Sequence, residues 1–175
     1  TSNKSNQLIN KPTTRAEWRH LLGWNEDCEQ AFSSSHAGDD TGIEPYMLGD
    51  ADELVMVMCA VGSYQPSFLL YRLNQQIPSI LSLETYQSDD GKTLKRSMEA
   101  ELWGESFFNA ETKELVILNA SRQTKDCGTW AKYSFSADNI GKLQELRSQL
   151  SCPDHVKESL DGDLTIPPAE WKPIK

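Results

Sequence analysis

An unbroken apolar run at residues 54–61 is the clearest feature of the chain. It ends at Gly62, and its length and its valines favour a strand buried on both faces over a helix. Residues 68–73 alternate in a way that suits a returning strand. Pro66 cannot donate a hydrogen bond to a sheet, so it fits the start of that strand or a free edge. The pattern predicts two core strands joined by a turn at Gly62 and Ser63.

Further strands are predicted where short apolar or alternating segments lie between turn residues. These segments are residues 43–48, 80–86, 98–103, 106–108, 114–118 and 128–135. Strong turn residues separate several of them, for example at residues 88–91. We therefore expect an antiparallel sheet of about six to eight strands.

Two short helices are predicted before the first strand. Thr14 and Glu17 have the spacing of a capping box. Asn25 is placed to cap a second helix, in which Cys28 and Phe32 lie four residues apart and share one face. The sequence thus predicts a helical hairpin whose apolar side faces the sheet.

A third helix is predicted over residues 139–150, with Asp138 as its cap and Pro153 beyond its end. The apolar residues at helical spacing are Ile140, Leu143, Leu146 and Leu150. The expected fold class is α+β, an antiparallel sheet with an N-terminal helical hairpin and a C-terminal helix. We divide the chain into a flexible leader at 1–12, a single domain at 13–155 and an irregular tail at 156–175 packed on that domain.

The charge balance narrows the set of partners. The 175 residues include 26 acidic and 17 basic side chains, for a net charge of −9. Nucleic-acid binding requires clustered lysine and arginine, which this chain lacks, so we exclude it. The same charge disfavours anionic membranes and favours a cationic protein as partner. No stretch is long and apolar enough for a transmembrane helix.

The four cysteines suggest an exported protein. They are Cys28, Cys59, Cys127 and Cys152. None forms a Cys-x-x-Cys pair, which argues against zinc and thioredoxin-type chemistry. An even, well-spaced set is typical of two disulfides. Three pairings are possible and we favour Cys28–Cys59 with Cys127–Cys152; the alternative is four free, buried cysteines in a cytosolic protein.

The start of the chain points to the same compartment. Residues 1–7 are polar and look like what remains after a signal peptide or a lipoprotein anchor has been removed. We expect a periplasmic or extracellular protein, with lipid anchoring through the removed segment as one form of it.

Short motifs around the cysteines resemble a known family. They are Cys59 followed by Gly62-Ser63-Tyr64, and later Asp126-Cys127-Gly128-Thr129-Trp130 before an aromatic strand. This pattern, across about residues 18–152, is similar to the bacterial domain-of-unknown-function family 1176. The resemblance implies an exported, cysteine-containing envelope protein with no assigned activity, and it supplies no catalytic residue.

A search for catalytic and metal-binding residues gives no candidates. None of the histidines (His20, His36 and His155) has a partner at metal-ligand spacing, and no phosphate-binding loop or nucleophile elbow is present. Glu99 and Glu101 alternate as solvated residues do, and a glycosidase pair would need a cleft around them. We expect no metal, no cofactor and no catalytic residue.

Aromatic residues are the better candidates for function, because tyrosine and tryptophan dominate binding hot spots. We select Gly62, Ser63, Tyr64 and Trp130 as the expected binding residues. The leading hypothesis is an exported envelope-associated protein, non-enzymatic, that binds a protein or a small ligand. The alternative is an inhibitor of a cationic hydrolase such as lysozyme, with the turn at residues 62–64 as the inserted loop. The oligomeric state is not predicted.

Overall fold

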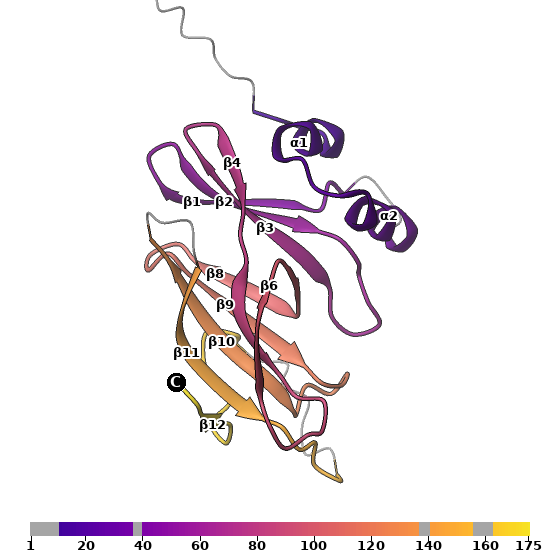
Figure 1. Cartoon of the computed structure of the whole chain (residues 1–175), viewed down its shortest axis with the longest axis vertical. Coiled ribbons are helices and arrows are strands. Elements are labelled where there is room, and N and C mark those ends of the chain that lie inside the picture. The colour runs from indigo at the N-terminus through magenta and orange to yellow at the C-terminus, as the bar shows by residue number, and fades with distance from the viewer. Residues whose placement is uncertain (1–10, 37–39, 137–140, 156–162) are drawn as a thin grey trace, which may run out of the picture.

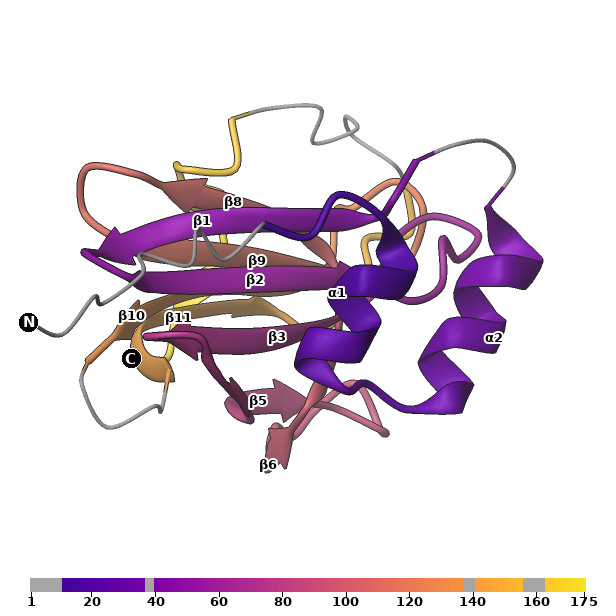
Figure 2. The same cartoon turned by 90° about the horizontal axis from the view of Figure 1, so that it is seen from above.

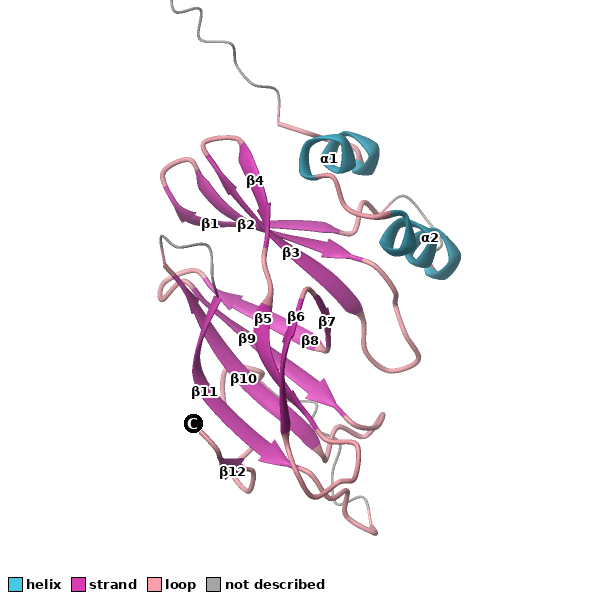
Figure 3. Cartoon of the chain, viewed as in Figure 1, coloured by secondary structure: helices cyan, strands magenta, loops and turns pink. Residues whose placement is uncertain are grey.

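The computed structural model describes residues 11–36, 40–136, 141–155 and 163–175. Within these ranges the chain forms two helices and twelve strands (Figure 3). The helices are α1 (Arg15–Leu22) and α2 (Glu26–Ser35). The strands are β1 (Ile43–Gly49), β2 (Asp52–Met58), β3 (Ser67–Asn74), β4 (Ile77–Ile80), β5 (Leu83–Gln87), β6 (Lys95–Glu99), β7 (Glu101–Trp103), β8 (Glu105–Asn109), β9 (Glu114–Ala120), β10 (Gly128–Phe135), β11 (Gly141–Gln149) and β12 (Lys172–Pro173).

The strands form two sheets that pack face to face, with the helices on the outer side of one of them (Figure 1). Sheet A has the order β1-β2-β3-β4, and β7 also pairs with β3. Sheet B has the order β6-β5-β11-β10-β9-β8, and β12 pairs with β11. Seen from above, α1 lies over β2 and β3 (Figure 2).

The α+β class with largely antiparallel strands and two N-terminal helices is therefore confirmed. The predicted size of six to eight strands agrees with sheet B, which has seven described strands, but the prediction of a single sheet is wrong, because five strands form a second sheet. The one parallel pair among the described strands joins Gly141 of β11 to Leu83 of β5.

The apolar run of β2 is buried on both faces, as its pattern predicts. Leu54 and Met56 point into the core between the sheets, whereas Val55 and Val57 face the helices. Since consecutive residues of a strand point to opposite sides, a strand covered on both sides has no position for a polar side chain.

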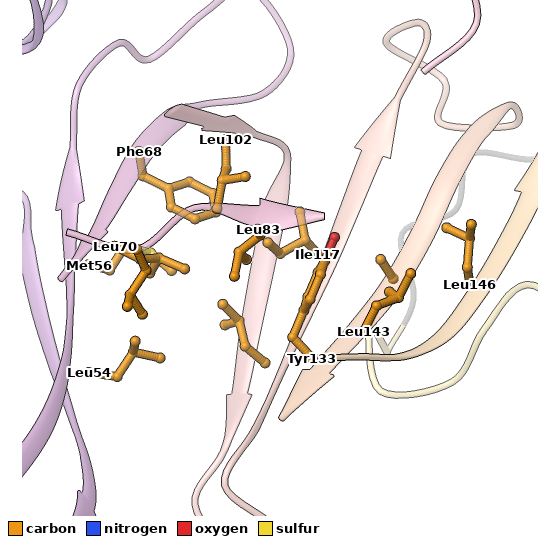
Figure 4. Close-up of a cluster of buried hydrophobic side chains, with 13 residues drawn as sticks. Leu54, Met56, Phe68, Leu70, Leu83, Leu102, Ile117, Tyr133, Leu143 and Leu146 are labelled. Carbon is orange, nitrogen blue, oxygen red and sulfur yellow. The ribbon is translucent and has the colours of Figure 1, made fainter. Parts of the chain in front are cut away.

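The core between the sheets draws on both of them (Figure 4). Its buried members are Leu54, Met56, Phe68, Leu70, Leu81, Leu83, Leu102, Leu115, Ile117, Ala131, Tyr133, Leu143 and Leu146. A second cluster joins the helices to the outer face of sheet A, and it includes Trp18, Leu22, Trp24, Val55, Val57, Leu69 and Tyr71. Burial of these apolar side chains is the main force that holds the layers together.

The helices begin as the sequence predicts. The Thr14 hydroxyl accepts a hydrogen bond from the backbone N–H of Glu17 at 3.2 Å, and the Asn25 side chain accepts one from the N–H of Cys28 at 2.8 Å. Both contacts satisfy donors that a helix start leaves free. The disulfide Cys28–Cys59 then links α2 covalently to the residue after β2, which confirms the first predicted pairing.

Arg15 adds a second link between the helices and sheet A. Its guanidinium donates to the carbonyl oxygens of Thr41 and Met58, both at 2.9 Å, and pairs with Glu29 at 3.1 Å. The Trp24 indole donates to the same Glu29 carboxylate at 2.7 Å. Burial lowers the pKa of Arg15, and the Glu29 carboxylate opposes that shift.

Residues 141–149 form strand β11, so the predicted C-terminal helix is wrong; its first residues, 138–140, lie outside the described part of the chain. The reason is a β-bulge in which Gln144 is an extra residue opposite the regular strand β10. A bulge shifts the alternation by one position. Leu143 and Leu146 therefore both face the core although they are three apart, which is also the spacing of a helix face.

The second predicted pairing, Cys127–Cys152, is also confirmed. It joins the residue before β10 to the segment after β11. Arg122 spans the same place, donating to both oxygens of Asp126 at 2.7 and 2.5 Å and to the carbonyl of Pro153 at 2.7 Å. These hydrogen bonds from Arg122 lower the pKa of Asp126 to about 2.

The C-terminal segment, residues 163–175, lies along the outer side of sheet B (Figure 1). Trp171 is buried there against Val116, Leu118 and Trp130. The expected leader and the first part of the expected tail, at residues 1–10 and 156–162, lie outside the described residues.

Candidate functional site

A polar cleft opens at one end of the interface between the sheets. It consists of two adjoining cavities that share Tyr86, Gln87, Asn119 and Thr129, and we call the whole the polar cleft. Its inner end also has Glu99, Glu101, Trp103 and Tyr133 in its lining, and its outer end has Ser88, Gly91, Ser121 and Leu150.

The two ends differ in size. The inner end has a volume of about 30 Å³, which is enough for only a few water molecules. The outer end has about 200 Å³ and leads to the surface. A ligand in this cleft therefore has its bulk at the outer end and only a small group at the inner end.

Topology explains why a cleft forms here. The chain crosses from sheet B to sheet A between β6 and β7, that is, between Glu99 and Glu101. The crossing places Glu99, Glu101 and Trp103 in the lining of the inner cavity, beside the inward-facing residues of β9 and β10, and Glu101 remains exposed to solvent. Trp103 is 40% exposed, although tryptophan is usually well buried.

The two carboxylates are the charged side chains among the described lining residues. Glu99 accepts a hydrogen bond from the hydroxyl of Ser97 at 2.6 Å, whereas Glu101 makes no side-chain hydrogen bond or ion pair within the described ranges. Such a site favours a cationic group, which can satisfy both acids.

Several uncharged side chains of the lining have donors and acceptors that form no hydrogen bond within the described residues. Among the described residues, Gln87 and Thr129 form no side-chain hydrogen bond, and Asn119 uses only its carbonyl oxygen, which accepts from the Gln65 amide at 2.8 Å. These side chains can bind the polar parts of a ligand at the outer end.

The two tyrosines of the cleft are fixed in place. The Tyr86 hydroxyl donates to the Glu84 carboxylate at 2.6 Å, and the Tyr133 hydroxyl donates to the Glu84 backbone carbonyl at 2.7 Å. Hydrogen bonds from Tyr86 and Arg96 lower the pKa of Glu84, and the same bond raises the pKa of Tyr86. Burial raises the pKa of Tyr133. Both phenols stay neutral at physiological pH, so they line the cleft as fixed, uncharged side chains.

The predicted turn residues lie beside this cleft. Gly62, Ser63 and Tyr64 form the loop between β2 and β3, and Gly62 has a φ of +70° that suits glycine. The Tyr64 hydroxyl donates to the carbonyl of Ser121, a residue of the outer cavity, at 3.3 Å. A Cβ at Gly62 would lie 3.5 Å from the Trp103 ring. The turn thus borders both ends of the cleft.

The structure does not bring Trp130 to this site. Trp130 is 1% exposed and lies on the outer face of sheet B, where its indole N–H donates to the carbonyl of Leu164 at 2.9 Å. Neighbours in a strand point to opposite sides, so Thr129 and Ala131 line the cleft and Trp130 does not.

Sequence reasoning missed the residues that carry the cleft, namely Tyr86, Asn119, Thr129 and the carboxylates as ligands. Trp103 had one usable signal, because an aromatic residue directly before a Gly104 that joins two short strands marks a place where the backbone changes direction. The others come together only through sheet pairing, which leaves no local pattern.

No group of three or more His, Cys, Asp or Glu side chains in the described part of the chain is arranged to hold a metal ion. Neither helix of the described ranges has the length and apolar character needed to cross a membrane.

Comparison of the chain with protein-family models, with curated proteins and with solved structures finds no match. The resemblance to family 1176 therefore stays a prediction.

Proposed function

We propose that this chain is an exported, non-enzymatic binding protein that takes a lysine side chain of a cationic partner protein into its polar cleft. The observation that carries the proposal is the inner end of the cleft, where Glu99 and Glu101 line a space of about 30 Å³. A lysine ammonium is a compact point charge with three donors, whereas the arginine guanidinium is a larger planar fork. The small space therefore favours the compact ammonium over the larger guanidinium.

The same volume argues against glycoside hydrolysis by the two carboxylates. A glycosidase needs room for a sugar ring between its acids. The space that both acids line, about 30 Å³, has room for only a few water molecules instead. Binding is therefore the better account of this pair.

Two features support an oxidising compartment and a cationic partner. Both disulfides are formed, and disulfides persist in the periplasm or outside the cell rather than in the cytosol. The net charge of −9 attracts a cationic protein over a distance before the lysine enters the cleft.

Peptide titration tests the proposal. We expect Gly-Gly-Lys-Gly-Gly, with blocked ends, to shift the amide signals of Asn119 and Thr129 in an ¹⁵N-labelled sample, and the arginine peptide to bind more weakly. Glu101→Gln should weaken lysine binding about tenfold, since a charge-assisted hydrogen bond to the ammonium is lost. Glu111→Gln makes the same change of charge on the exposed β8–β9 turn and should leave binding unchanged. Equal affinities of the two variants would refute the proposal.

An inhibitor of a cationic hydrolase such as lysozyme is the special case in which the partner is an enzyme. The position of the turn at residues 62–64 beside the mouth of the cleft favours it, because a protruding loop can enter an active site. Measurement of lysozyme activity at micromolar concentrations of this protein tests it, and unchanged activity would eliminate this case while leaving the lysine site open.

A further inference from the structure

A second cavity lies on the opposite side of sheet B from the polar cleft. It is formed between the outer face of β9 and β10 and the C-terminal segment, and its volume is about 320 Å³. Its lining is Leu118, Trp130, Asp163, Leu164, Ile166, Pro167, Pro168 and Ala169. None of these residues belongs to the polar cleft.

The roof of this cavity, residues 163–171, is attached to the outer face of sheet B at both of its ends. Near its start, the Leu164 carbonyl accepts the hydrogen bond from the Trp130 indole at 2.9 Å. Near its end, Trp171 is 4% exposed and packs into the cluster on the outer face. Between them, Pro167 and Pro168 restrict the backbone. A roof that is anchored twice and stiff in the middle keeps the cavity open.

The two polar side chains that line the cavity, those of Trp130 and Asp163, already form hydrogen bonds. The indole N–H of Trp130 is used by Leu164, and one Asp163 oxygen accepts from the backbone N–H and the hydroxyl of Thr165 at 2.9 and 2.6 Å. What faces the cavity is therefore mainly hydrocarbon. Ile166 at its rim is 67% exposed, so the apolar surface continues to the outside.

We propose that this cavity is a binding site for a small neutral apolar molecule. An engineered apolar cavity of about 150 Å³ binds benzene, and a space of twice that volume holds about ten to twelve carbon atoms. A mainly apolar lining gives a polar ligand little to replace its lost water. This inference is independent of the lysine site, because the two cavities share no residue.

Titration with naphthalene, which has ten carbon atoms, tests the proposal on the full chain. We expect the indole N–H signal of Trp130 to shift in the ¹⁵N spectrum, because the ring of the probe lies against it. The indole signal of Trp24 should not move, since Trp24 lies under the helices and donates to Glu29. The outcome that overturns the proposal is the same shift at both indoles, or none at Trp130.

Two variants distinguish binding at this site from nonspecific binding of naphthalene elsewhere on the protein. Ile166→Glu should weaken naphthalene binding about tenfold, because the ligand would remove water from a charge at the rim. Ala169→Phe fills the cavity and should abolish binding. Ile77→Glu is the matched control, since Ile77 is also 67% exposed but lies in β4 of sheet A, and it should bind as the unchanged protein does. Equal binding by the three variants would overturn the proposal.

An apolar group could also come from a lipid chain, so vesicles of a neutral phosphatidylcholine form a second arm. We expect the protein to remain in solution when the vesicles are floated. Flotation with the vesicles, in the absence of binding to free naphthalene, would overturn the assignment to a small free molecule.

Discussion

Single arginine side chains link segments of this chain that lie far apart in the sequence. Arg15 ties the helices to the end of β2, Arg72 pairs with Asp52 at 2.7 Å and also contacts Ser136, and Arg122 spans the second disulfide. The guanidinium suits this role because its donors form a rigid fork that can serve a carboxylate and a carbonyl together. These links could not be predicted, because every residue has a backbone carbonyl and the sequence does not show which one a side chain will contact.

The Arg122–Asp126 pair predicts a pH-dependent contribution to stability. The folded pKa of Asp126, about 2, lies below the ordinary 3.8 of an unfolded chain. A depressed pKa stabilises the fold above the unfolded value and ceases to do so as the pH falls through the folded value. Asp126→Asn should therefore cost up to about 1 kcal/mol at pH 7, a value limited by solvent screening. The cost should disappear between about pH 4 and pH 2.

Urea unfolding of both proteins at pH 7 and pH 2.5 measures this difference. Asp89→Asn is the control: its ion pair with Lys95 is exposed on both sides and should contribute little at either pH. A cost for Asp126→Asn that is the same at both pH values would contradict the assigned cause.

At the scale of elements, local patterns predicted whether a segment forms a helix or a strand better than they predicted which sheet a strand joins. The starts of both helices and the burial of β2 follow from capping residues and from alternation, which are local. The division into two sheets depends on three crossings among the described strands, from β4 to β5, from β6 to β7 and from β7 to β8, and the segments on either side of each crossing are equally compatible with strand. The polar cleft forms at the crossing from β6 to β7, so its residues could not be grouped from the sequence.

The error over β11 leads to a prediction about Gln144. If the helical spacing of Leu143 and Leu146 comes from a bulge, deletion of Gln144 should leave a regular strand. Both flanking registers with β10 would be kept, and the same side chains would face the core. Beyond its backbone, the deletion removes an exposed hydrogen bond from Gln144 to Ser134. We expect a loss of about 1 kcal/mol in the free energy of unfolding.

Deletion of Arg147, in the same strand, is the matched control. It shifts the pairing of every later residue of β11 by one position and moves Ser148, which is 4% exposed, from the inner face to the outer one. The loss should be several times larger, about 3 kcal/mol or more, since buried polar and apolar positions are exchanged. Equal losses in the two deletions, measured by urea unfolding, would mean that the bulge is not the reason for the spacing.

At the scale of the whole molecule, the chain forms layers, and the two disulfides lie in different parts of this arrangement. Cys28–Cys59 connects the helices with sheet A, and Cys127–Cys152 closes the end of sheet B. The even number and wide spacing of the cysteines predicted two disulfides, and the pairing that forms is the one favoured among three possible pairings. Their separations of 31 and 25 residues give each bridge about 3–4 kcal/mol in the chain-entropy model.

The layered arrangement predicts that the two bridges protect different regions. The helices contact sheet A through side chains, with Arg15 as an added link, so they can open without breaking a strand pair. In a Cys28→Ser/Cys59→Ser protein, the amides of Trp18 and Phe32 should exchange with deuterium at least about tenfold faster, because local opening no longer has to overcome the bridge. The amides of Ile117 and Tyr133, in the centre of sheet B, should change much less.

The converse double variant, Cys127→Ser/Cys152→Ser, removes the second disulfide and tests the other region. Its lost bridge holds β10 and β11 together, and opening there disrupts the core that both sheets share. We therefore expect faster exchange at Tyr133 and little change at Phe32 under conditions where the protein stays folded. Since the polar cleft draws its walls from β9 and β10, lysine binding should weaken in this protein and persist in the other. Uniformly faster exchange in both proteins would show that the layers unfold as one unit, and the separate roles of the two bridges would then be wrong.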